Sequence, residues 1–224
     1  MTDKEFIAEI APIVQKYAKQ YGYKVCSAVI AQACIESAYG RSSLSAKYNN
    51  FFGLKASSDW KGAVVSLKTN EEYKQGVLTP IYAKFRVYSS LDEGIKGYYD
   101  FIQYPRYANL KHATTAQQYL EYIKADGYAT AYTYVNTCMR VVYQHDLTQY
   151  DTIPDSFPVS YAGIVTADAL RVRTGWSTSY PVANVGGHDF LLPRGVCVAF
   201  EAECNGWAKL AGYNGWCSLS YIAR

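Results

Sequence analysis

Hydrophobic residues recur every three or four positions through most of the first 150 residues, which is the spacing of helices that bury one face. Residues 5–21 place Phe6, Ile10 and Val14 on such a face, and Gly22 follows as a stop signal. The same pattern predicts further helices from about Lys24 to Tyr39, after the capping pair Ser90 and Glu93, between Thr115 and Gly127, and from Tyr134 to Gln144.

The helical spacing is lost between residues 59 and 88, where β-prone runs flank Gly76. Such a pattern favours a hairpin-like lobe. Residues 1–148 are therefore expected to form one α+β domain that is mainly helical and carries a short β insertion.

The pattern changes again after residue 148. Residues 149–160 contain two prolines and show neither helical nor alternating spacing, which is typical of a linker. Residues 161–224 consist of short, partly alternating segments separated by Gly, Pro and Asn, as in a small all-β barrel or sandwich. We therefore expect a second, separate domain there.

Composition narrows the possible functions. A chain of 224 residues, half of them hydrophobic, can hold a main domain and a smaller one. The net charge is only +3 and no dense basic stripe is present, which argues against a nucleic-acid partner. The sequence contains no run of about 20 apolar residues, the length that a membrane-spanning helix requires.

The first ten residues, "MTDKEFIAEI", do not form a secretory signal, since they lack a basic start followed by an apolar run. We expect either a leader removed before this start or a protein made in the cytoplasm that reaches its target by another route. The six cysteines and three histidines lack the paired spacing of zinc ligands. We expect free thiols, no metal and no cofactor.

One carboxylate, Glu36, lies inside a small and apolar helical run that stops at Gly40. Burial raises the pKa of a carboxylic acid, and an acid that stays protonated near neutral pH can donate its proton to a leaving group. The alternative from position alone is that Glu36 pairs with a lysine or caps a neighbouring backbone group.

The stretch "AQACIESAYGRSSLSAKYNNFFGLK", residues 31–55, resembles the signature of the bacterial glucosaminidases of glycoside hydrolase family 73. The resemblance continues in "TNEEYKQG", "AKFRVYSSLDEGIKGYYDFI" and "GYAT", in family order, and covers nearly all of residues 5–147. It implies a lysozyme-like α+β fold in which a helical lobe faces a β-hairpin lobe across a groove. It also implies an enzyme that cuts the β-1,4 glycan of peptidoglycan.

The resemblance places the catalytic general acid at Glu36 and a second carboxylate in the hairpin. Counting from Thr69 favours Glu71, whereas the adjacent Tyr73 and the spacing to the following glycine and phenylalanine favour Glu72. Adjacent strand residues face opposite sides, so only one of the two can face the groove. The separation of two acids decides between inversion and retention, and an N-acetyl sugar can instead use its own acetamide as nucleophile.

Sugar rings present apolar faces that pack on aromatic rings, so aromatic residues of the motifs are candidates for substrate binding. Tyr128 of "GYAT" matches a substrate-contacting tyrosine of the family. The other candidates are Phe51, Phe52, Tyr107 and Asn50, the last of which can equally organise its loop. Arg86 is expected to tie down the hairpin lobe. The family usually continues "YAT" with Asp-Pro, whereas this chain has Ala131 and Tyr132.

The C-terminal segments "ALRVRTGWSTSYPVANV" and "LLPRGVCVAFEAECNGWAKLAGYNGWCSLSYI" resemble a bacterial SH3-type cell-wall binding domain. In such a domain Trp176, Tyr180 and Trp207 are candidates for contact with cell-wall peptide or glycan, or else they complete a small core. Tethering a weak binder to a hydrolase raises its effective concentration on an insoluble polymer.

The resemblances together predict a monomeric endo-β-N-acetylglucosaminidase that acts on peptidoglycan at the cell wall or outside the cell. A phage-type endolysin fits the missing signal, and an autolysin or a lytic part of a secretion or conjugation apparatus are alternatives. Other hypotheses for the function are a muramidase or lytic transglycosylase that acts on the same polymer, and a non-catalytic wall-binding protein.

Overall fold

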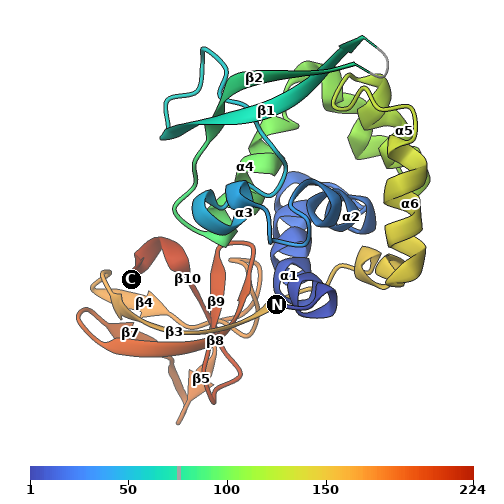
Figure 1. Cartoon of the computed structure of the whole chain (residues 1–224). Coiled ribbons are helices and arrows are strands. Elements are labelled where there is room, and N and C mark those ends of the chain that lie inside the picture. The colour runs from blue at the N-terminus through green and yellow to red at the C-terminus, as the bar shows by residue number, and fades with distance from the viewer. Residues whose placement is uncertain (75–76) are drawn as a thin grey trace. The chain divides into compact units, whose positions relative to one another are not determined.

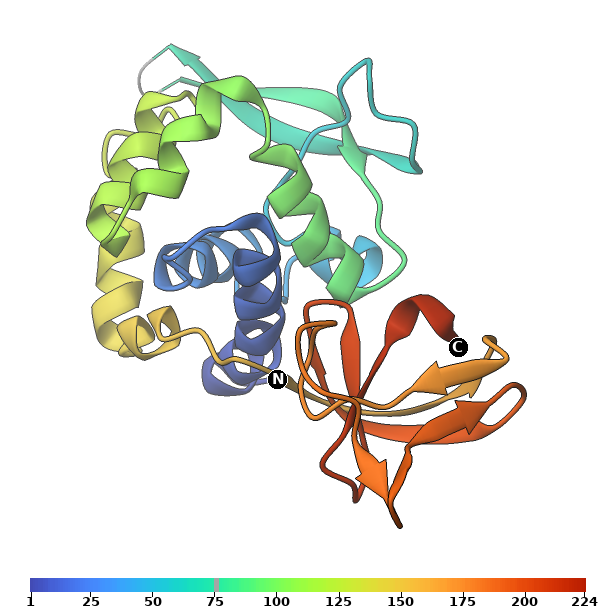
Figure 2. The ribbon, with the colours of Figure 1, turned by 180° about the vertical axis from the view of Figure 1, so that it is seen from behind.

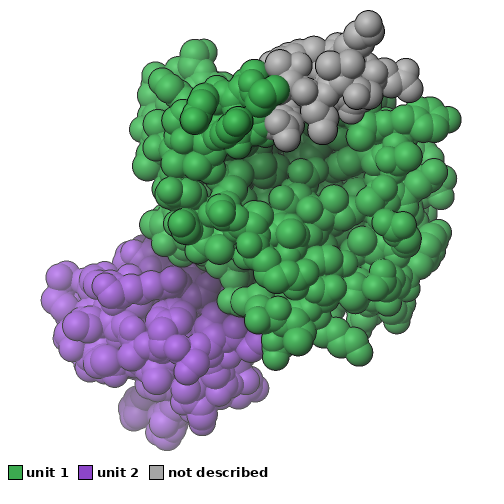
Figure 3. Space-filling view, viewed as in Figure 1, with its two compact units in different colours: residues 1–153 green, residues 154–224 purple. Residues whose placement is uncertain are grey.

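The computed structural model describes the backbone of residues 1–74 and 77–224, and the side chains of residues 1–69 and 80–224. The chain forms two compact units, Met1–Ile153 and Pro154–Arg224, which Figure 3 colours separately. In the described residues no helix is both long and apolar enough to cross a membrane.

Unit 1 is mainly helical, as the hydrophobic spacing predicts (Figure 1). Its helices are α1 (Asp3–Tyr21), α2 (Ser27–Glu36), α3 (Ser43–Tyr48), α4 (Leu91–Phe101), η1 (Pro105–His112), α5 (Ala116–Ala125), α6 (Tyr134–Gln144) and η2 (Leu147–Asp151). The short elements α3, η1 and η2 were not predicted, because five to eight residues hold too few turns to show a period.

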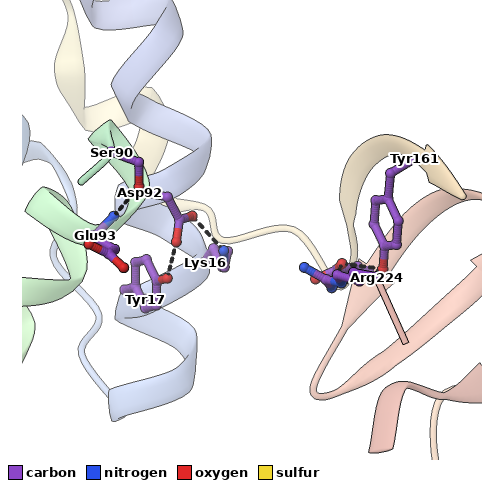
Figure 4. Close-up of polar contacts among 8 residues, drawn as sticks. Lys16, Tyr17, Ser90, Asp92, Glu93, Tyr161 and Arg224 are labelled. Carbon is purple, nitrogen blue, oxygen red and sulfur yellow. Dashed lines mark hydrogen bonds and ion pairs between the residues drawn. The ribbon is translucent and has the colours of Figure 1, made fainter. Parts of the chain in front are cut away.

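The helix α1 has strong signals at both ends. Thr2 and Glu5 form a capping box, and Gly22 closes the helix in the left-handed conformation with φ of 78°. Asp92 of α4 ties this helix to its neighbour, because it accepts hydrogen bonds from Lys16 and Tyr17 of α1 (Figure 4).

The helix α2 is shorter than the predicted span of about Lys24 to Tyr39. It ends at Glu36, and Ala38 and Tyr39 have φ of 50° and 55°, which no helix can accommodate. The apolar spacing continues past this end only because the following turn also packs on the core.

The helix α2 lies at the centre of unit 1, in contact with α1, α5, α6 and η2 (Figures 1 and 2). Its side chains from Ser27 to Cys34 are buried. A helix that is apolar on nearly all sides belongs inside a bundle, and this burial fixes the position of the Glu36 backbone at its end.

The predicted hairpin is present in the backbone. Strands β1 (Val64–Lys74) and β2 (Val77–Arg86) pair antiparallel, with Val64 opposite Arg86 and a register shift between Glu72 and Lys74. In Figure 1 the hairpin lies on the side of α4 and α5. The α+β expectation for this part of the chain is therefore confirmed.

Gly94 lets α4 approach the end of α3 closely. A Cβ at this position would lie 2.0 Å from the carbonyl oxygen of Asn49, a distance that no side chain allows. The glycine therefore fixes how α4 meets the loop that leads into the hairpin lobe.

Unit 2 is built almost entirely from short strands: β3 (Phe157–Val165), β4 (Ala169–Arg171), β5 (Asn184–Val185), β6 (His188–Asp189), β7 (Leu191–Pro193), β8 (Cys197–Cys204), β9 (Trp207–Leu210), β10 (Trp216–Ser218), the single turn η3 (Leu219–Tyr221) and β11 (Ile222–Ala223). Five of them form a sheet in the order β10-β9-β8-β3-β11. The sheet covers an apolar cluster that includes Val172, Phe200 and Cys217. The all-β expectation for this part of the chain is confirmed.

The end of the chain is anchored in this sheet. Arg224 and Tyr161 both bond the carboxylate of Glu203, and the guanidinium carbon lies 4.4 Å from the centre of the Tyr161 ring (Figure 4). This network joins β11 to β3 and β8 and closes one side of the unit.

Part of the segment expected as a linker, residues 149–160, has regular structure. Asp151 ends η2, and Phe157 begins β3 with a buried ring. Only residues 152–156 lie outside helices and strands. The prolines suggested a longer linker. The contacts of Asp151 and Phe157 are made with distant residues, so the local sequence does not reveal that these positions have regular structure.

Candidate active site

The helical part of unit 1 and the base of the hairpin enclose a cavity of about 730 Å³. Its walls come from the end of α2, the loop before β1, the end of β2 and the segments that follow α4 and α5. They are formed by Glu36, Phe52, Gly53, Leu54, Lys55, Ala56, Ser57, Arg86, Phe101, Tyr104, Pro105, Arg106, Tyr107, Gly127 and Tyr128.

Glu36, the last residue of α2, opens onto this cavity. It keeps exposed surface because it faces the cavity, but the surrounding walls separate much of the carboxyl from bulk water. This desolvation raises the pKa of Glu36 to about 7. Among the side chains that the structure describes, none forms a hydrogen bond or ion pair with the carboxyl. A carboxyl in this state can hold and release a proton near neutral pH.

Gly53 brings the backbone close to this acid. Its φ is 63°, and a Cβ added there would lie 3.8 Å from Oε2 of Glu36. A side chain at this position would therefore occupy the space in front of the carboxyl, and most residues would strain the loop. The glycine keeps the proton donor accessible.

Asp151 holds the other end of α2. Its carboxylate accepts hydrogen bonds from the backbone N–H groups of Cys26 and Ser27, at 2.7 and 2.8 Å, and from the Ser27 hydroxyl at 2.8 Å. No side chain within α2 caps this end. An anion from η2 therefore satisfies the first N–H groups of the helix that carries Glu36.

A buried polar network fixes α2 one turn before Glu36. Gln32 donates to the hydroxyl of Tyr134 at 2.8 Å and accepts from Tyr98 at 2.8 Å, while Tyr98 and Tyr119 share a hydrogen bond of 2.9 Å. The glutamine of the "AQ" pair is thus a supporting residue that the sequence analysis did not single out. Its signal was a polar side chain within an apolar run.

Two of the expected substrate-binding aromatics, Phe52 and Tyr128, line the cavity together. The hydroxyl of Tyr128 donates to the carbonyl oxygen of Phe52 at 2.9 Å, and the Phe52 ring stacks on Tyr98 with ring centres 4.1 Å apart. Tyr107 also lines the cavity, and its buried hydroxyl has no hydrogen bond in standard geometry among the described residues.

Asn50 and Phe51 do not line the cavity, so their expected contact with substrate is corrected here. The Asn50 side chain is 1% exposed and bonds the N–H and carbonyl of Leu54 and the carbonyl of Arg86. Phe51 packs against Phe6 in the core. Asn50 organises the loop, which was the alternative role considered for it.

The second expected acid, Glu72, lies among the residues whose side chains are outside the described part of the structure, as does Glu71. In the backbone Glu72 pairs with Leu78, and Glu71 pairs with Thr79. Both acids therefore belong to the hairpin, at adjacent positions of β1.

Arg86 is the cavity residue whose role differs most from expectation. Its guanidinium carbon lies 4.6 Å from the centre of a Trp60 ring and 5.4 Å from that of Phe101, and its Nε donates to the carbonyl oxygen of Lys55 at 3.2 Å. The residue does tie down the base of the hairpin, but it also faces the cavity.

Among the described residues, no three His, Cys, Asp or Glu side chains come together as a metal site would require. Five of the cysteines are buried thiols, whereas Cys197 at the start of β8 is exposed.

In unit 2 the expected wall-binding aromatics separate into two places. The Trp176 ring lies 5.5 Å from that of Tyr180 and 5.4 Å from that of Trp216, which the sequence analysis did not list. Trp207 lies on β9, paired with Ser218 of β10. Trp176, Tyr180 and Trp216 form an aromatic cluster, in which Tyr180 is exposed, Trp176 is half-buried and Trp216 is buried.

Comparisons with known proteins show which family the chain resembles. Residues 11–147 match the glucosaminidase family, described as mannosyl-glycoprotein endo-beta-N-acetylglucosaminidase. The peptidoglycan hydrolase FlgJ of Escherichia coli (strain K12) is 34% identical over 146 residues, which are 63% of this chain and 46% of that protein. The exo-glucosaminidase LytG of Bacillus subtilis is 32% identical over 136 residues, 58% of this chain and 47% of that protein.

A solved structure resembles unit 1 as well. The catalytic domain of the autolysin Auto from Listeria monocytogenes superposes with a TM-score of 0.56 and 29% identity, over 66% of this chain and 86% of that domain. The chain spans about half the length of the curated relatives it matches. The family match covers more than half of the chain, and the chain therefore belongs to the glucosaminidase family.

Proposed function

We propose that the chain is a glycoside hydrolase that cuts the glycan strands of peptidoglycan, with Glu36 as the general acid. The observation that carries the proposal is a lone carboxyl with a pKa of about 7 at the wall of a large cavity. Its location in the glucosaminidase match, and the name of the FlgJ relative, supply the substrate class.

The geometry suits proton donation to a glycosidic oxygen. Near neutral pH a large share of Glu36 is protonated, so the carboxyl already carries the proton that it donates. The half-buried Tyr128 offers a ring surface in the cavity on which the apolar face of a sugar can pack, while Phe52, which is 3% exposed, contributes to the cavity wall. Gly53 leaves room for the oxygen that receives the proton.

A second carboxylate completes the proposed mechanism, and we assign it to Glu72. It would activate water or attack the anomeric carbon, depending on its separation from Glu36. A route in which the substrate acetamide acts as nucleophile would make Glu72 less important. Measuring the anomeric configuration of the first product by NMR separates inversion from retention.

The proposed bond is the β-1,4 linkage after N-acetylglucosamine, cut within the strand. The name of the LytG relative includes exo-glucosaminidase, so that cleavage from a strand end is the first alternative to test. A muramidase or lytic transglycosylase would cut the other linkage of the same polymer.

Mass spectrometry of digested peptidoglycan tests the bond directly. Products with a reducing-end N-acetylglucosamine support the proposal, whereas reducing-end or anhydro-muramic products contradict it. Long intermediate fragments at early times indicate internal cuts, and release of only the smallest unit indicates cuts from the end.

Substitution of Glu36 by Gln tests the acid. The amide keeps the shape of the side chain but cannot donate the proton, and general acid catalysis contributes about 100- to 10,000-fold. Glu9→Gln on the exposed side of α1 is the matched control and should keep its rate. If Glu36→Gln clears walls within a few-fold of the parent protein, the assignment is wrong. Failure of the parent protein to clear any purified wall would favour the non-catalytic wall-binding alternative.

For unit 2 we propose an SH3-type wall-binding role, with wall peptide as its ligand. Trp176 and Tyr180 lie together beside Trp216, and Trp207 is a separate candidate. Such a tether would hold a monomeric enzyme at the cell wall. Binding of isolated walls by the Trp176→Ala variant, compared with the parent protein, tests this role.

A further inference from the structure

Arg86 is a buried cation that faces the cavity. Its side chain is only 5% exposed, and it lies against the rings of Trp60 and Phe101. The aromatic faces favour a positive charge between them, which offsets part of the cost of removing the guanidinium from water. One N–H group is used by the carbonyl of Lys55.

No carboxylate forms a direct ion pair with this cation within the described part of the chain. None of the ion pairs among the described residues includes Arg86. Asp59 is near enough for the charge of Arg86 to help lower the pKa of its carboxyl, but it forms no ion pair with Arg86 and accepts a hydrogen bond from Tyr104. A buried charge without a counter-ion is costly, and such charges are usually paired. The missing partner points to a ligand.

A second unsatisfied group lies in the same cavity. The hydroxyl of Tyr107 is buried with no hydrogen bond in standard geometry among the described residues, although the nearby guanidinium of Arg106, 4.8 Å from the centre of the Tyr107 ring, acts to lower its pKa, which burial raises. The rings of Tyr107 and Phe101 are 5.4 Å apart, and Phe101 also contacts Arg86. Tyr107 and Arg86 therefore both lie against the ring of Phe101.

These groups lie apart from the proposed cleavage point. Arg86 lies against Phe101, whose ring centre is 6.2 Å from that of Tyr128, and desolvation is the cause of the raised pKa of Glu36, with no lowering by the Arg86 charge. A group bound by Arg86 would therefore not be the sugar oxygen that Glu36 protonates. It would be a substituent on a nearby part of the strand.

We propose that Arg86, helped by Tyr107, binds a carboxylate carried by the glycan strand and so makes the cavity selective for acidic strands over neutral ones. This inference rests on the proposed function, because peptidoglycan is the glycan that carries such groups. Muramic acid bears a lactyl carboxyl, and its peptide stem bears others. A planar guanidinium can donate two parallel hydrogen bonds to either.

The parent protein provides a test that needs no mutation. Peptide-free strands with ionised lactyl carboxylates are compared with the same strands after these carboxyls are reduced to alcohols. We expect kcat/KM to fall about tenfold or more on reduction, mainly through KM, because hydrogen bonds between charged groups are strong. Faster cleavage of peptide-bearing strands than of peptide-free ones would assign the ligand to the stem carboxylates instead of the lactyl group.

Variants then assign the effect to one residue. Arg86→Gln should lose most of the difference between native and reduced strands, and Arg86→Lys should keep part of it. Lys84→Gln, on an exposed position of β2, is the matched control and should behave as the parent protein. Thermal melts show whether each variant is folded, and the substrate comparison with the parent protein stands even if Arg86→Gln is not.

The outcomes separate the two proposals. Equal cleavage of native and reduced strands overturns the carboxylate site but leaves the hydrolase. A preference that persists in folded Arg86→Gln also overturns it. Cleavage of neither strand by the parent protein removes the proposed function itself.

Discussion

The hydroxyl of Tyr128 donates a hydrogen bond of 2.9 Å to the backbone carbonyl of Phe52. The bond joins the loop after α5 to the loop after α3, which passes close to Glu36. Both residues line the cavity. Burial raises the pKa of Tyr128 well above its ordinary value, so that the hydroxyl remains a neutral donor. The expected sugar contact of Tyr128 must therefore come from its ring.

Two substitutions of Tyr128 distinguish the contribution of its ring from that of its hydroxyl. We expect Tyr128→Phe to keep activity within a few-fold and to lower the free energy of unfolding by about 1 kcal/mol, the typical contribution of one hydrogen bond. Tyr128→Ala should lower kcat/KM about 100-fold, because it also removes the ring that lines the cavity and lies against Tyr98 and Phe101, and so misplaces the groups around Glu36. Kinetics on soluble glycan and denaturant melts measure both effects. Equal losses for the two variants would mean that the hydroxyl, and not the ring, is the part of Tyr128 that activity requires.

The pKa of Glu36 predicts the pH dependence of the reaction. A general acid must be protonated, so the activity should fall as the pH rises through about 7, instead of through the ordinary value near 4.5. The profile of kcat/KM for soluble strands reports the pKa of the free enzyme. A fall that begins near pH 5 would contradict the desolvated state of this carboxyl.

The same shift predicts a pH-dependent stability. The folded-state pKa of Glu36 is raised above its unfolded value, so the folded protein binds the proton more tightly between about pH 4.5 and 7. Stability from this group is present below the unfolded pKa and is lost as the pH rises toward 7. Glu36→Gln should therefore be more stable than the parent protein at pH 8 and nearly equal to it at pH 4. Thermal melts at the two pH values measure the difference.

Much of this site could be predicted from sequence because its signals are local. The apolar run around Glu36 and the capping residues Ser90 and Thr115 depend on neighbours within a few positions, and the helices that they predict are present. The extra length predicted for α2 was wrong, because a turn that packs on the core continues the apolar spacing.

Other features depend on distant contacts. In "NNFFG" the motif could not show which side chain turns inward, and the left-handed residues Asn49 and Gly53 direct Phe51 to the core and Phe52 to the cavity. The guanidinium of Arg86 lies against the rings of Trp60 and Phe101. These two residues are 41 positions apart in the sequence, and the fold brings them together. Periodicity carries no information on such pairs.

For the second acid we expect Glu72→Gln to cost more activity than Glu71→Gln. The two are neighbours on β1, paired with Leu78 and Thr79, and adjacent strand residues face opposite sides. Each variant serves as the other's control, since both remove one negative charge from the same strand. Rates on soluble glycan decide the order. Equal losses would deny Glu72 a special role, and the reverse order would transfer the role to Glu71.

The contacts of Asp151 decide where a fragment that contains only the hydrolase unit must end. The carboxylate of Asp151 accepts three hydrogen bonds from Cys26 and Ser27, and Gln15 donates to the carbonyl groups of Tyr150 and Thr152 at 2.9 and 3.1 Å. All of these contacts lie within residues 1–153, the first compact unit. A cut after residue 148 removes them, whereas a cut after residue 153 keeps them.

We therefore expect residues 1–153 to fold and to cut soluble glycan at nearly the full rate, while binding walls less well than the whole chain, because the effective concentration from unit 2 is lost. Residues 1–148 should be less stable by on the order of 3 kcal/mol, because each hydrogen bond to a charged group contributes about 1.5–3 kcal/mol and the start of α2 loses its cap. Asp151→Ala in the whole chain is the control that removes the cap alone, and it should reproduce most of this loss without weakening wall binding. Denaturant melts, wall pull-down and rates on soluble strands give the three readouts. Equal stability of the two fragments would show that Asp151 does not support α2, and equal wall binding by residues 1–153 and the whole chain would exclude a targeting role for unit 2.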